Sequence, residues 1–335
     1  MTDLPTNRQW RIAERPSGRM VEESDFTWRE EPARAPGPGE LLLKTIFLGF
    51  DPSQKGQMEN RANYAAPLEI GDVMRSRGIG EVLQSNDPAF QPGDKVVGSI
   101  GWQDHPTVKA ADMLKVADDE LLSANLGVLG STGLTAYFGM KHIGVPFPGD
   151  TVVITGAAGA TGSVAGQIAK LAGCKVIGIA GGPAKCDWLT KDLGFDHALD
   201  YREGDLAGRL KPLVKGGVNL LWDNVGGQQL DDILGMIALN ARVVICGGIA
   251  RYSTADMPPG PQNYFNLVFM RATMRGFLLG DYTAEFPLGR ARLRDWIRAG
   301  KLKHAEDVQH GLENAPRTMR RLFEGANLGK QILKL

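Results

Sequence analysis

The sequence predicts an α/β protein in which a β-rich N-terminal unit precedes a doubly wound parallel sheet. From residue 149 onward, short apolar runs alternate with helical patterns, which is typical of parallel sheets with helices on both faces. A glycine-rich turn joins the first of these runs to an amphipathic helix, and before about residue 125 short β runs alternate with turn signals. The 335 residues are enough for about two domains.

The elements follow in order along the chain. In the first part, strands are predicted at residues 40–50, 79–83 and 95–100, with proline–glycine turns at 35–39 and 91–94 between them. They indicate a compact, mostly antiparallel β unit. In the second part the predicted strands are residues 151–155, 175–180, 198–200, 219–222, 242–246 and 274–278, with helices at 162–172, 185–193 and 228–239.

The chain ends with helices and one more strand. The first of these helices places Leu293, Trp296 and Ile297 on one face, and the second covers residues 314–323. Residues 330–335 read as a strand, which we expect to pack back on the N-terminal β unit.

Composition and charge exclude several classes of protein. Lys plus Arg and Asp plus Glu both number 38, so no net charge attracts nucleic acid or an anionic membrane. No apolar run approaches the length of a membrane-spanning helix, and residues 1–20 lack the apolar stretch of a secretory signal. The three cysteines, Cys174, Cys186 and Cys246, lie far apart and support neither a disulfide framework nor a zinc cluster. We therefore expect a cytoplasmic chain.

The strongest local motif is Thr155-Gly-Ala-Ala-Gly-Ala-Thr-Gly162, which follows an apolar strand and opens a helix. A dinucleotide site needs such a turn, because glycines let the backbone approach the pyrophosphate and the helix start supplies N–H groups. The glycines stand at positions 156, 159 and 162 rather than in the GxGxxG spacing, so a turn that binds nothing stays an alternative.

The end of the second strand favours NADP(H) over NAD(H). An NAD site places an acid about 20 residues further on, to bind the ribose hydroxyl. Here residues 180–185 contain no acid, and Lys185 is suited to bind a 2′-phosphate. The alternative is that Lys185 is only a solvent-exposed residue in the first turn of the next helix. Glycine-rich stretches also follow the fourth and fifth strands, at 222–227 and 246–252, where open α/β sheets bind ligands. The alternative is that these two stretches bind no ligand and contain only turn glycines and a surface tyrosine.

The chain resembles zinc-independent medium-chain dehydrogenases/reductases of the leukotriene/prostaglandin reductase and alkenal/one reductase (curcumin-reductase-like) type. The shared motifs span nearly the whole chain in the family's order. They are Arg8-Gln-Trp10, Ile70-Gly-Asp-Val-Met-Arg75, Leu134-Thr-Ala-Tyr-Phe-Gly139, Gly159-Ala-Thr-Gly-Ser-Val-Ala-Gly-Gln-Ile-Ala-Lys170, Gly181-Gly-Pro-Ala-Lys-Cys186, Asp223-Asn-Val-Gly-Gly227 and Leu322-Phe-Glu-Gly-Ala-Asn-Leu-Gly-Lys330.

The resemblance implies a GroES-like β-barrel domain for the substrate, residues 1–125 and 290–335, and a doubly wound Rossmann domain, residues 126–289. It implies a homodimer joined along edge strands and an NADPH site. Gly159, Ala160, Thr161 and Gly162 would meet the pyrophosphate, and Lys185 and Tyr201 the 2′-phosphate. The ribose and nicotinamide would be lined by Thr135, Asn224, Cys246, Gly247, Gly248, Ile249, Tyr252, Phe277, Leu278, Leu279 and Asn327.

No metal is expected. Residues 75–80 replace the Gly-His-Glu run of the zinc-dependent members, and none of the five histidines lies in a ligand motif. Without a zinc Lewis acid, the chemistry left is hydride transfer from NADPH to an electrophilic carbon. For an enone or enal, charge then builds on the carbonyl oxygen and needs a donor, for which the resemblance indicates Tyr252. A loop-fixing role is the alternative for Tyr252.

One departure concerns the substrate wall. Many relatives read Asp-Pro-Tyr-Met-Arg where this chain has Asp51-Pro-Ser-Gln-Lys55, so Ser53 replaces a tyrosine that could polarise the carbonyl. Tyr64 is a second candidate for this wall, with packing as its alternative. The sequence thus predicts an NADPH-dependent ene-reductase for small enones or enals. A quinone reductase, or an NADPH-binding protein without useful turnover, is the alternative.

Overall fold

The computed structural model describes residues 4–59, 66–119, 121–252 and 259–335. The chain forms two compact units, Met1–Gly127 with Glu306–Leu335, and Val128–Ala305. The second unit begins at Val128, two residues after the predicted start at residue 126. It ends at Ala305, where the prediction placed its end at residue 289. Helix α8 (Phe286–Arg298) belongs to the second unit because its Gly289 packs tightly against Leu134 and Phe138.

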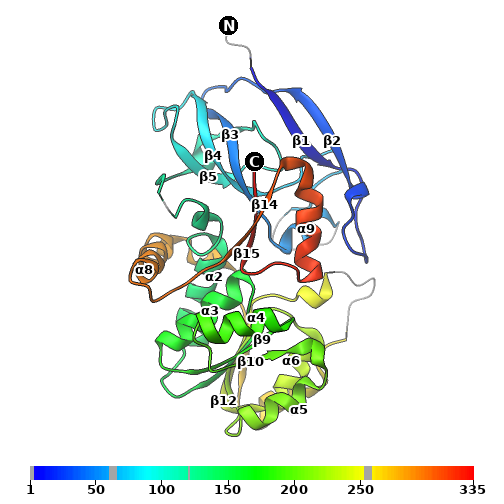
Figure 1. The fold of residues 1–335 in the computed structure, drawn as a ribbon, viewed down its shortest axis with the longest axis vertical. Coiled ribbons are helices and arrows are strands. Elements are labelled where there is room, and N and C mark those ends of the chain that lie inside the picture. Colours follow the sequence, from blue (N-terminus) through cyan, green and yellow to red (C-terminus); the bar gives the residue numbers. More distant parts are fainter. Residues whose placement is uncertain (1–3, 60–65, 120, 253–258) are drawn as a thin grey trace. The chain divides into compact units, whose positions relative to one another are not determined.

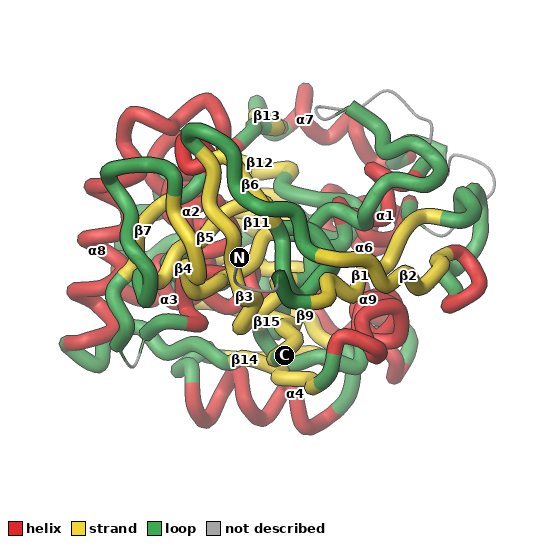
Figure 2. Tube along the Cα trace, turned by 90° about the horizontal axis from the view of Figure 1, so that it is seen from above, coloured by secondary structure: helices red, strands yellow, loops and turns green. Residues whose placement is uncertain are grey.

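The first unit contains a mixed seven-stranded sheet in the order β14-β15-β3-β4-β5-β7, with β6 paired to β3 (Figure 2). Only β14 and β15 run parallel to each other, so the prediction of a mostly antiparallel unit is confirmed. The last strand pairs with β3 through Ile332 and Gly49, which confirms that the chain end packs back on this unit. The strands are β3 (Glu40–Gly49), β4 (Arg77–Ser85), β5 (Lys95–Ser99), β6 (Thr107–Lys109), β7 (Leu114–Val116), β14 (Glu306–His310) and β15 (Lys330–Lys334).

Two helices accompany this sheet, α1 (Ser53–Met58) and α9 (Ala315–Glu324). The core between them and the strands is apolar and aromatic, with Trp102 fully buried between the rings of Phe26 and Phe50. Met319 and Leu322 of α9 bury their side chains in the same core, as the predicted helix at 314–323 requires.

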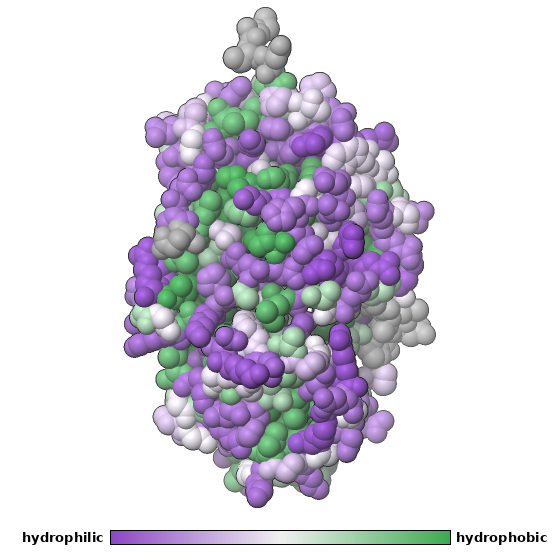
Figure 3. Space-filling view, viewed as in Figure 1, coloured by the Kyte–Doolittle hydropathy of each residue, from purple (hydrophilic) through white to green (hydrophobic). Residues whose placement is uncertain are grey.

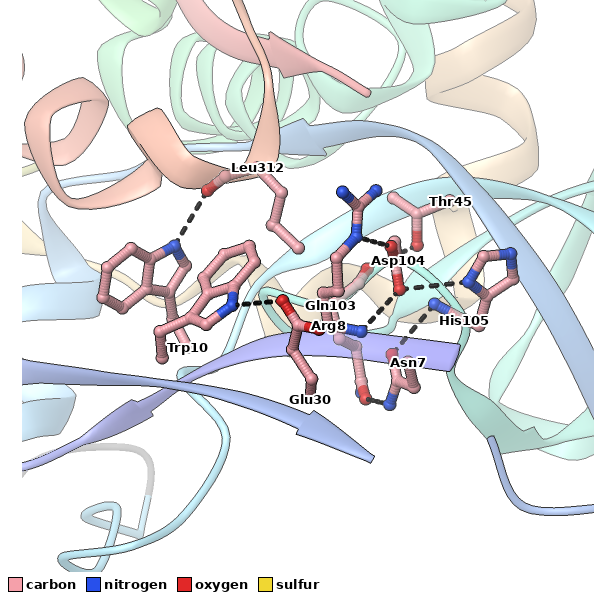
Figure 4. A network of polar contacts seen from close by, with 10 residues as sticks. Asn7, Arg8, Trp10, Glu30, Thr45, Gln103, Asp104, His105 and Leu312 are labelled. Carbon is pink, nitrogen blue, oxygen red and sulfur yellow. Dashed lines mark hydrogen bonds and ion pairs between the residues drawn. The ribbon is translucent and has the colours of Figure 1, made fainter. Parts of the chain in front are cut away.

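A separate hairpin, β1 (Thr6–Ile12) with β2 (Phe26–Pro32), is fastened to this unit by the carboxylate of Asp104. Asp104 accepts bonds from the backbone and the side chain of Arg8 and lies 3.0 Å from His105 Nδ1 (Figure 4). Close by, Trp10 donates its indole N–H to the Leu312 carbonyl. The Arg8-Gln-Trp10 motif therefore serves attachment of the hairpin.

The second unit is built on a fully parallel six-stranded sheet in the order β10-β9-β8-β11-β12-β13. This is the doubly wound order, with the first strand at the centre. The strands are β8 (Thr151–Thr155), β9 (Lys175–Ala180), β10 (His197–Asp200), β11 (Val218–Asp223), β12 (Ile237–Ile245) and β13 (Thr273–Gly276).

Helices cover both faces of this sheet (Figure 1). On one face, α5 (Leu206–Leu210) and α6 (Gly227–Leu234) pack on apolar side chains of β8, β9 and β11. The other face is covered by α2 (Ser131–Gly139), α3 (Ala160–Leu171) and the π-helical turn Trp188–Asp192. On this face Gly166 and Gly178 leave room for the ring of Phe195. The predicted fold class is confirmed.

Two predicted helices of the second unit differ from the structure. The helix predicted at 228–239 ends at Leu234, because Gly235 follows and Ile237 already begins β12. The helix predicted at 185–193 is divided into α4 (Pro183–Asp187) and the π-helical turn after it. The remaining short helix is α7 (Asn266–Phe269).

Within the described residues, every helix falls short of what a membrane span demands in length and hydrophobicity. Figure 3 shows hydrophilic side chains over most of the face it draws.

Replacing Asp104 with alanine should destabilise the first unit, because Asp104 is 5% exposed and accepts the bonds from the backbone and side chain of Arg8 that hold β1 in place. We expect the free energy of unfolding to fall by about 2 kcal/mol, measured by urea denaturation. Glu31→Ala is the control, since it removes a more exposed pair with Arg11 that is worth at most about 1 kcal/mol. Equal losses in the two variants would contradict the role assigned to Asp104.

Candidate functional site

The candidate site lies at the carboxyl ends of the parallel strands in the second unit. Strands β8 and β11 are neighbours there, although β9 follows β8 in the chain, so the strand order reverses between them. Open α/β sheets bind ligands in the crevice at such a reversal. The four sequence stretches singled out by their glycines and cations all follow the ends of strands β8, β9, β11 and β12.

The turn after β8 brings backbone N–H groups to this edge. Gly156 has a φ of 56°, a conformation that favours glycine, and α3 begins four residues later at Ala160. A Cβ at Gly162 would lie 2.5 Å from the Gly156 carbonyl oxygen, so a larger residue would push the helix off the turn. The N–H groups of Ala160, Thr161 and Gly162 form the first turn of α3, where an anionic group is favoured.

The carboxylate of Asp223 fastens the neighbouring strand ends to this turn. It is fully buried and accepts a 2.6 Å bond from the Thr155 hydroxyl at the end of β8. It also accepts the backbone N–H groups of Val225 and Gly226, which fixes the loop after β11. Burial raises the pKa of Asp223, and these donors work against that shift.

Asn224 is held beside this carboxylate. Its backbone N–H donates to the Thr155 hydroxyl and its side-chain amide to the Thr155 carbonyl, at 2.9 and 2.6 Å. Its amide oxygen accepts the indole N–H of the buried Trp222. Asn224 is therefore fixed at the centre of the sheet edge, half-buried, as a group lining a ligand site should be.

The loop after β12 lies over the loop after β11. Cys246 and Gly247 donate their backbone N–H groups to the Asp223 carbonyl, and Ile249 donates to the Asn224 carbonyl. A Cβ at Gly247 would lie 3.3 Å from that Asn224 carbonyl oxygen, so glycine permits this approach. The loop ends in a 3₁₀ turn, in which the Tyr252 N–H donates to the Ile249 carbonyl. Tyr252 is half-buried beyond this turn.

Cations gather where β9 and β10 end. The side chains of Tyr201 and Arg202 lie against Gly181, since a Cβ there would come within 3.0 Å of both. The guanidinium of Arg202 lies 5.9 Å from the centre of the Tyr201 ring. Lys185 follows on α4, half-buried. The Gly182 and Arg202 backbone N–H groups lower the pKa of Asp200, whose carboxylate thereby ties the two loops together.

Arg202 is a candidate that the sequence reasoning missed. It stands directly after Tyr201, at the end of a predicted strand, so a search for cations at every strand end would have found it. Its position over Gly181 depends on the pairing of β9 with β10, which links residues about 20 apart.

The remaining candidates of the second unit lie around α2 and the segment after β13. Thr135 is half-buried on α2, which contacts Trp222 and Phe277 closely at Gly139. Leu278 is 47% exposed, and Leu279 begins the following 3₁₀ helix.

The candidates from the first unit are Ser53, Tyr64 and Asn327. Ser53 is half-buried at the start of α1, and Asn327 donates its amide to the Gly329 carbonyl in the turn before β15. Tyr64 lies outside the described residues. Among the side chains that the structure describes, no three of His, Cys, Asp or Glu come together in a way that could hold a metal ion.

Comparisons with known proteins point the same way as this geometry. Residues 8–116 match the family described as the N-terminal domain of oxidoreductase, and residues 160–293 match the family described as zinc-binding dehydrogenase. The chain is 37% identical to an NADPH-dependent curcumin reductase of Escherichia coli, over 98% of this chain and 97% of that protein. It is also 37% identical to a 2-alkenal reductase (NADP(+)-dependent) of Nicotiana tabacum, over 89% and 88% of the two chains.

A solved structure is similar over the same length. CurA from Vibrio vulnificus, in complex with NADPH, matches with a TM-score of 0.92 and 35% identity over 98% of both chains. The similarity covers both units rather than the dinucleotide fold alone.

The thiol of Cys246 gives a test of this strand edge. Burial raises its pKa to about 12, so the folded chain keeps a proton that the unfolded chain loses near pH 8.5. Stability should therefore fall as the pH rises through this window. Between about pH 7.5 and about pH 10, the parent should lose roughly 1 to 2 kcal/mol more unfolding free energy than Cys246→Ala. The measurement is urea denaturation at both pH values, and identical losses in parent and variant would contradict the burial of this thiol.

Proposed function

The chain belongs to the zinc-independent medium-chain dehydrogenase/reductase family, and on this premise we propose that it is an NADPH-dependent ene-reductase. Its substrates are α,β-unsaturated ketones or aldehydes, whose carbon–carbon double bond it reduces. The observation that supports the proposal is the strand edge itself, where the cations after β9 and β10, the glycine turn after β8 and the fixed amide of Asn224 after β11 follow one another along the sheet.

The residues present fit NADPH better than NADH. Arg202 supplies a positive charge beside Tyr201, and Lys185 supplies a second one on α4 just after the end of β9, which suits a 2′-phosphate. The buried Asp200 accepts backbone N–H groups of Gly182 and Arg202, which hold the two cation-bearing loops together. Gly159 to Gly162 would meet the pyrophosphate through the open turn at the start of α3. Asn224, the 246–252 loop and the 277–279 segment would line the ribose and nicotinamide.

The protein's part in the reaction is positioning and charge stabilisation. When bound, NADPH would supply the hydride that the β-carbon of the substrate accepts, and a proton from water would complete the reduction at the α-carbon. As negative charge grows on the carbonyl oxygen, the Tyr252 hydroxyl donates a hydrogen bond to it. Ser53 and Tyr64 remain the candidates of the first unit for contact with the substrate, and serine is a shorter side chain than the tyrosine of many relatives.

The experiment is NADPH oxidation, followed by absorbance, with a panel of linear enones, enals and quinones and with NADH in parallel. Steady turnover of enones with NADPH, and little with NADH, is the expected result. Turnover of quinones alone would reassign the protein as a quinone reductase. If NADPH raises the Tm but no acceptor is reduced, the chain is a binding protein and the proposal fails.

Lys185→Ala and Arg202→Ala should weaken the hold on the 2′-phosphate. We expect each to raise KM for NADPH by about tenfold, because one charged hydrogen bond is worth about 1.5 to 3 kcal/mol. KM for NADH should change by less than about twofold. Lys191→Ala, which loses an exposed pair with Asp187, is the control. A parallel rise for both cofactors would remove the 2′-phosphate role.

Tyr252→Phe removes the proposed donor while keeping the ring. We expect kcat/KM for an enone to fall by at least about tenfold, corresponding to about 1.4 kcal/mol of lost transition-state stabilisation. The Kd of NADPH, measured by fluorescence, should stay nearly constant. A change of kcat/KM within about twofold would show that Tyr252 is not the donor.

The homodimer that we infer would join copies along β13. This edge strand is exposed along its whole length, and apolar side chains beside it are exposed as well. They include Tyr264, Phe265, Val268 and Phe269, each more than half exposed. An unpaired edge next to such a patch is typical of an interface. Sedimentation velocity should give a dimer for the parent and a monomer for Val268→Glu; a monomeric parent would overturn the inference.

A further inference from the structure

Lys330 is a buried cation that spans the first unit from its last strand to the loop before α1. Its side chain is 4% exposed, and its Nζ donates to the Phe50 carbonyl at 3.0 Å and to Asp51 Oδ1 at 2.5 Å. Its partners lie about 280 residues earlier in the chain. The aliphatic part packs on Gly127, where a Cβ would lie 3.2 Å from Lys330 Cβ and Cγ.

The loop that Lys330 holds carries Ser53. Strand β3 ends at Gly49, and α1 begins with Ser53 only two residues after Asp51. Gln54 supports the other side of this loop, accepting the Asp51 N–H and donating to the Arg75 carbonyl at 2.8 Å each. The Ser76 hydroxyl donates to the Gly49 carbonyl. Neutral hydrogen bonds therefore hold one side of the loop, and a buried charge holds the other.

The far end of α1 is anchored as well. Lys55 is fully buried, and its Nζ donates to the Pro16 carbonyl and to Glu59. Arg15 donates to the Met58 carbonyl at 2.8 Å. How far Ser53 can move therefore depends on the loop that precedes α1. Lys330, on the last strand of the chain, bonds to this loop.

Lys330 also follows the Asn327 turn directly. In that turn the Asn327 amide donates to the Gly329 carbonyl, and Gly329 has a φ of 66°. The backbone of Lys330 then enters β15, and the next residue, Gln331, accepts the Phe50 N–H. One residue therefore connects the segment with Asn327 to the segment with Ser53.

We propose that Lys330 is a positioning residue that sets the place of Ser53 relative to Asn327 within the first unit. This rests on the proposed function, which assigns Ser53 to the substrate and Asn327 to the cofactor. Methionine at this position would fill the same space along Gly127 but would leave the Phe50 carbonyl and Asp51 without their buried donor. The loop would then be free to move away from the β15 start.

The test compares Lys330→Met with Lys95→Met in the full-length chain. Lys95 is a suitable control because it lies in the same sheet, is 14% exposed and pairs with Glu81 at 2.7 Å. Lys330→Met should lower kcat/KM for an enone by about tenfold. The Kd of NADPH should rise by less than about threefold, since most of the cofactor residues lie in the second unit. Lys330→Arg should restore most of the activity.

A second readout does not need turnover. In hydrogen–deuterium exchange, the peptide covering residues 50–58 should exchange at least about tenfold faster in Lys330→Met than in Lys95→Met. If both the exchange and the kinetics match those of the control, Lys330 serves stability alone and the proposal is overturned. If the parent reduces no enone, the proposed function fails by that result, while the exchange rates still decide whether Lys330 holds the loop.

Discussion

The second unit depends on one buried carboxylate. Asp223 is fully buried, and its carboxylate accepts the Thr155 hydroxyl at the end of β8 and two backbone N–H groups of the loop after β11. Because its backbone carbonyl also accepts the N–H groups of Cys246 and Gly247, three strand ends are tied at one residue. A site assembled from separate loops needs such a tie, since loops without shared bonds would move independently.

Features that depend on neighbouring residues could be predicted from the sequence. The bounds predicted for β8 and β9 agree with the structure at both ends, because each is a short apolar run limited by glycines. The turn before α3 was predictable for the same reason, since Gly156 and Gly162 are required by local backbone geometry. The end of α6 was predicted too late because the apolar residues of the next strand continue the helical pattern past Gly235.

Long-range contacts could not be predicted in this way. Thr155 and Asp223 meet across 68 residues and Lys330 and Asp51 across 279, and neither pair leaves a local pattern. A buried lysine and a surface lysine look alike in a sequence, since burial depends on which strands pair. The motif quoted from the family ended at Lys330, yet only the pairing of β15 with β3 gives that residue its partners.

The cations proposed for the 2′-phosphate and the residue proposed for the substrate wall, Ser53, are supported by separate sets of bonds. The cations proposed for a 2′-phosphate, Lys185 on α4 and Arg202 after β10, follow the ends of β9 and β10, where the bonds of Asp200 stay within the second unit. Ser53 stands on α1, whose supports, Lys330, Gln54 and Lys55, all lie within the first. The bonds described for α1 and those described at the ends of β9 and β10 involve different residues, so a substitution in the loop before α1 leaves the cation cluster in place. Ser53, which stands where many relatives have a tyrosine, is a substitution of this kind, and in our proposal it changes the substrate wall without changing the residues proposed for the cofactor.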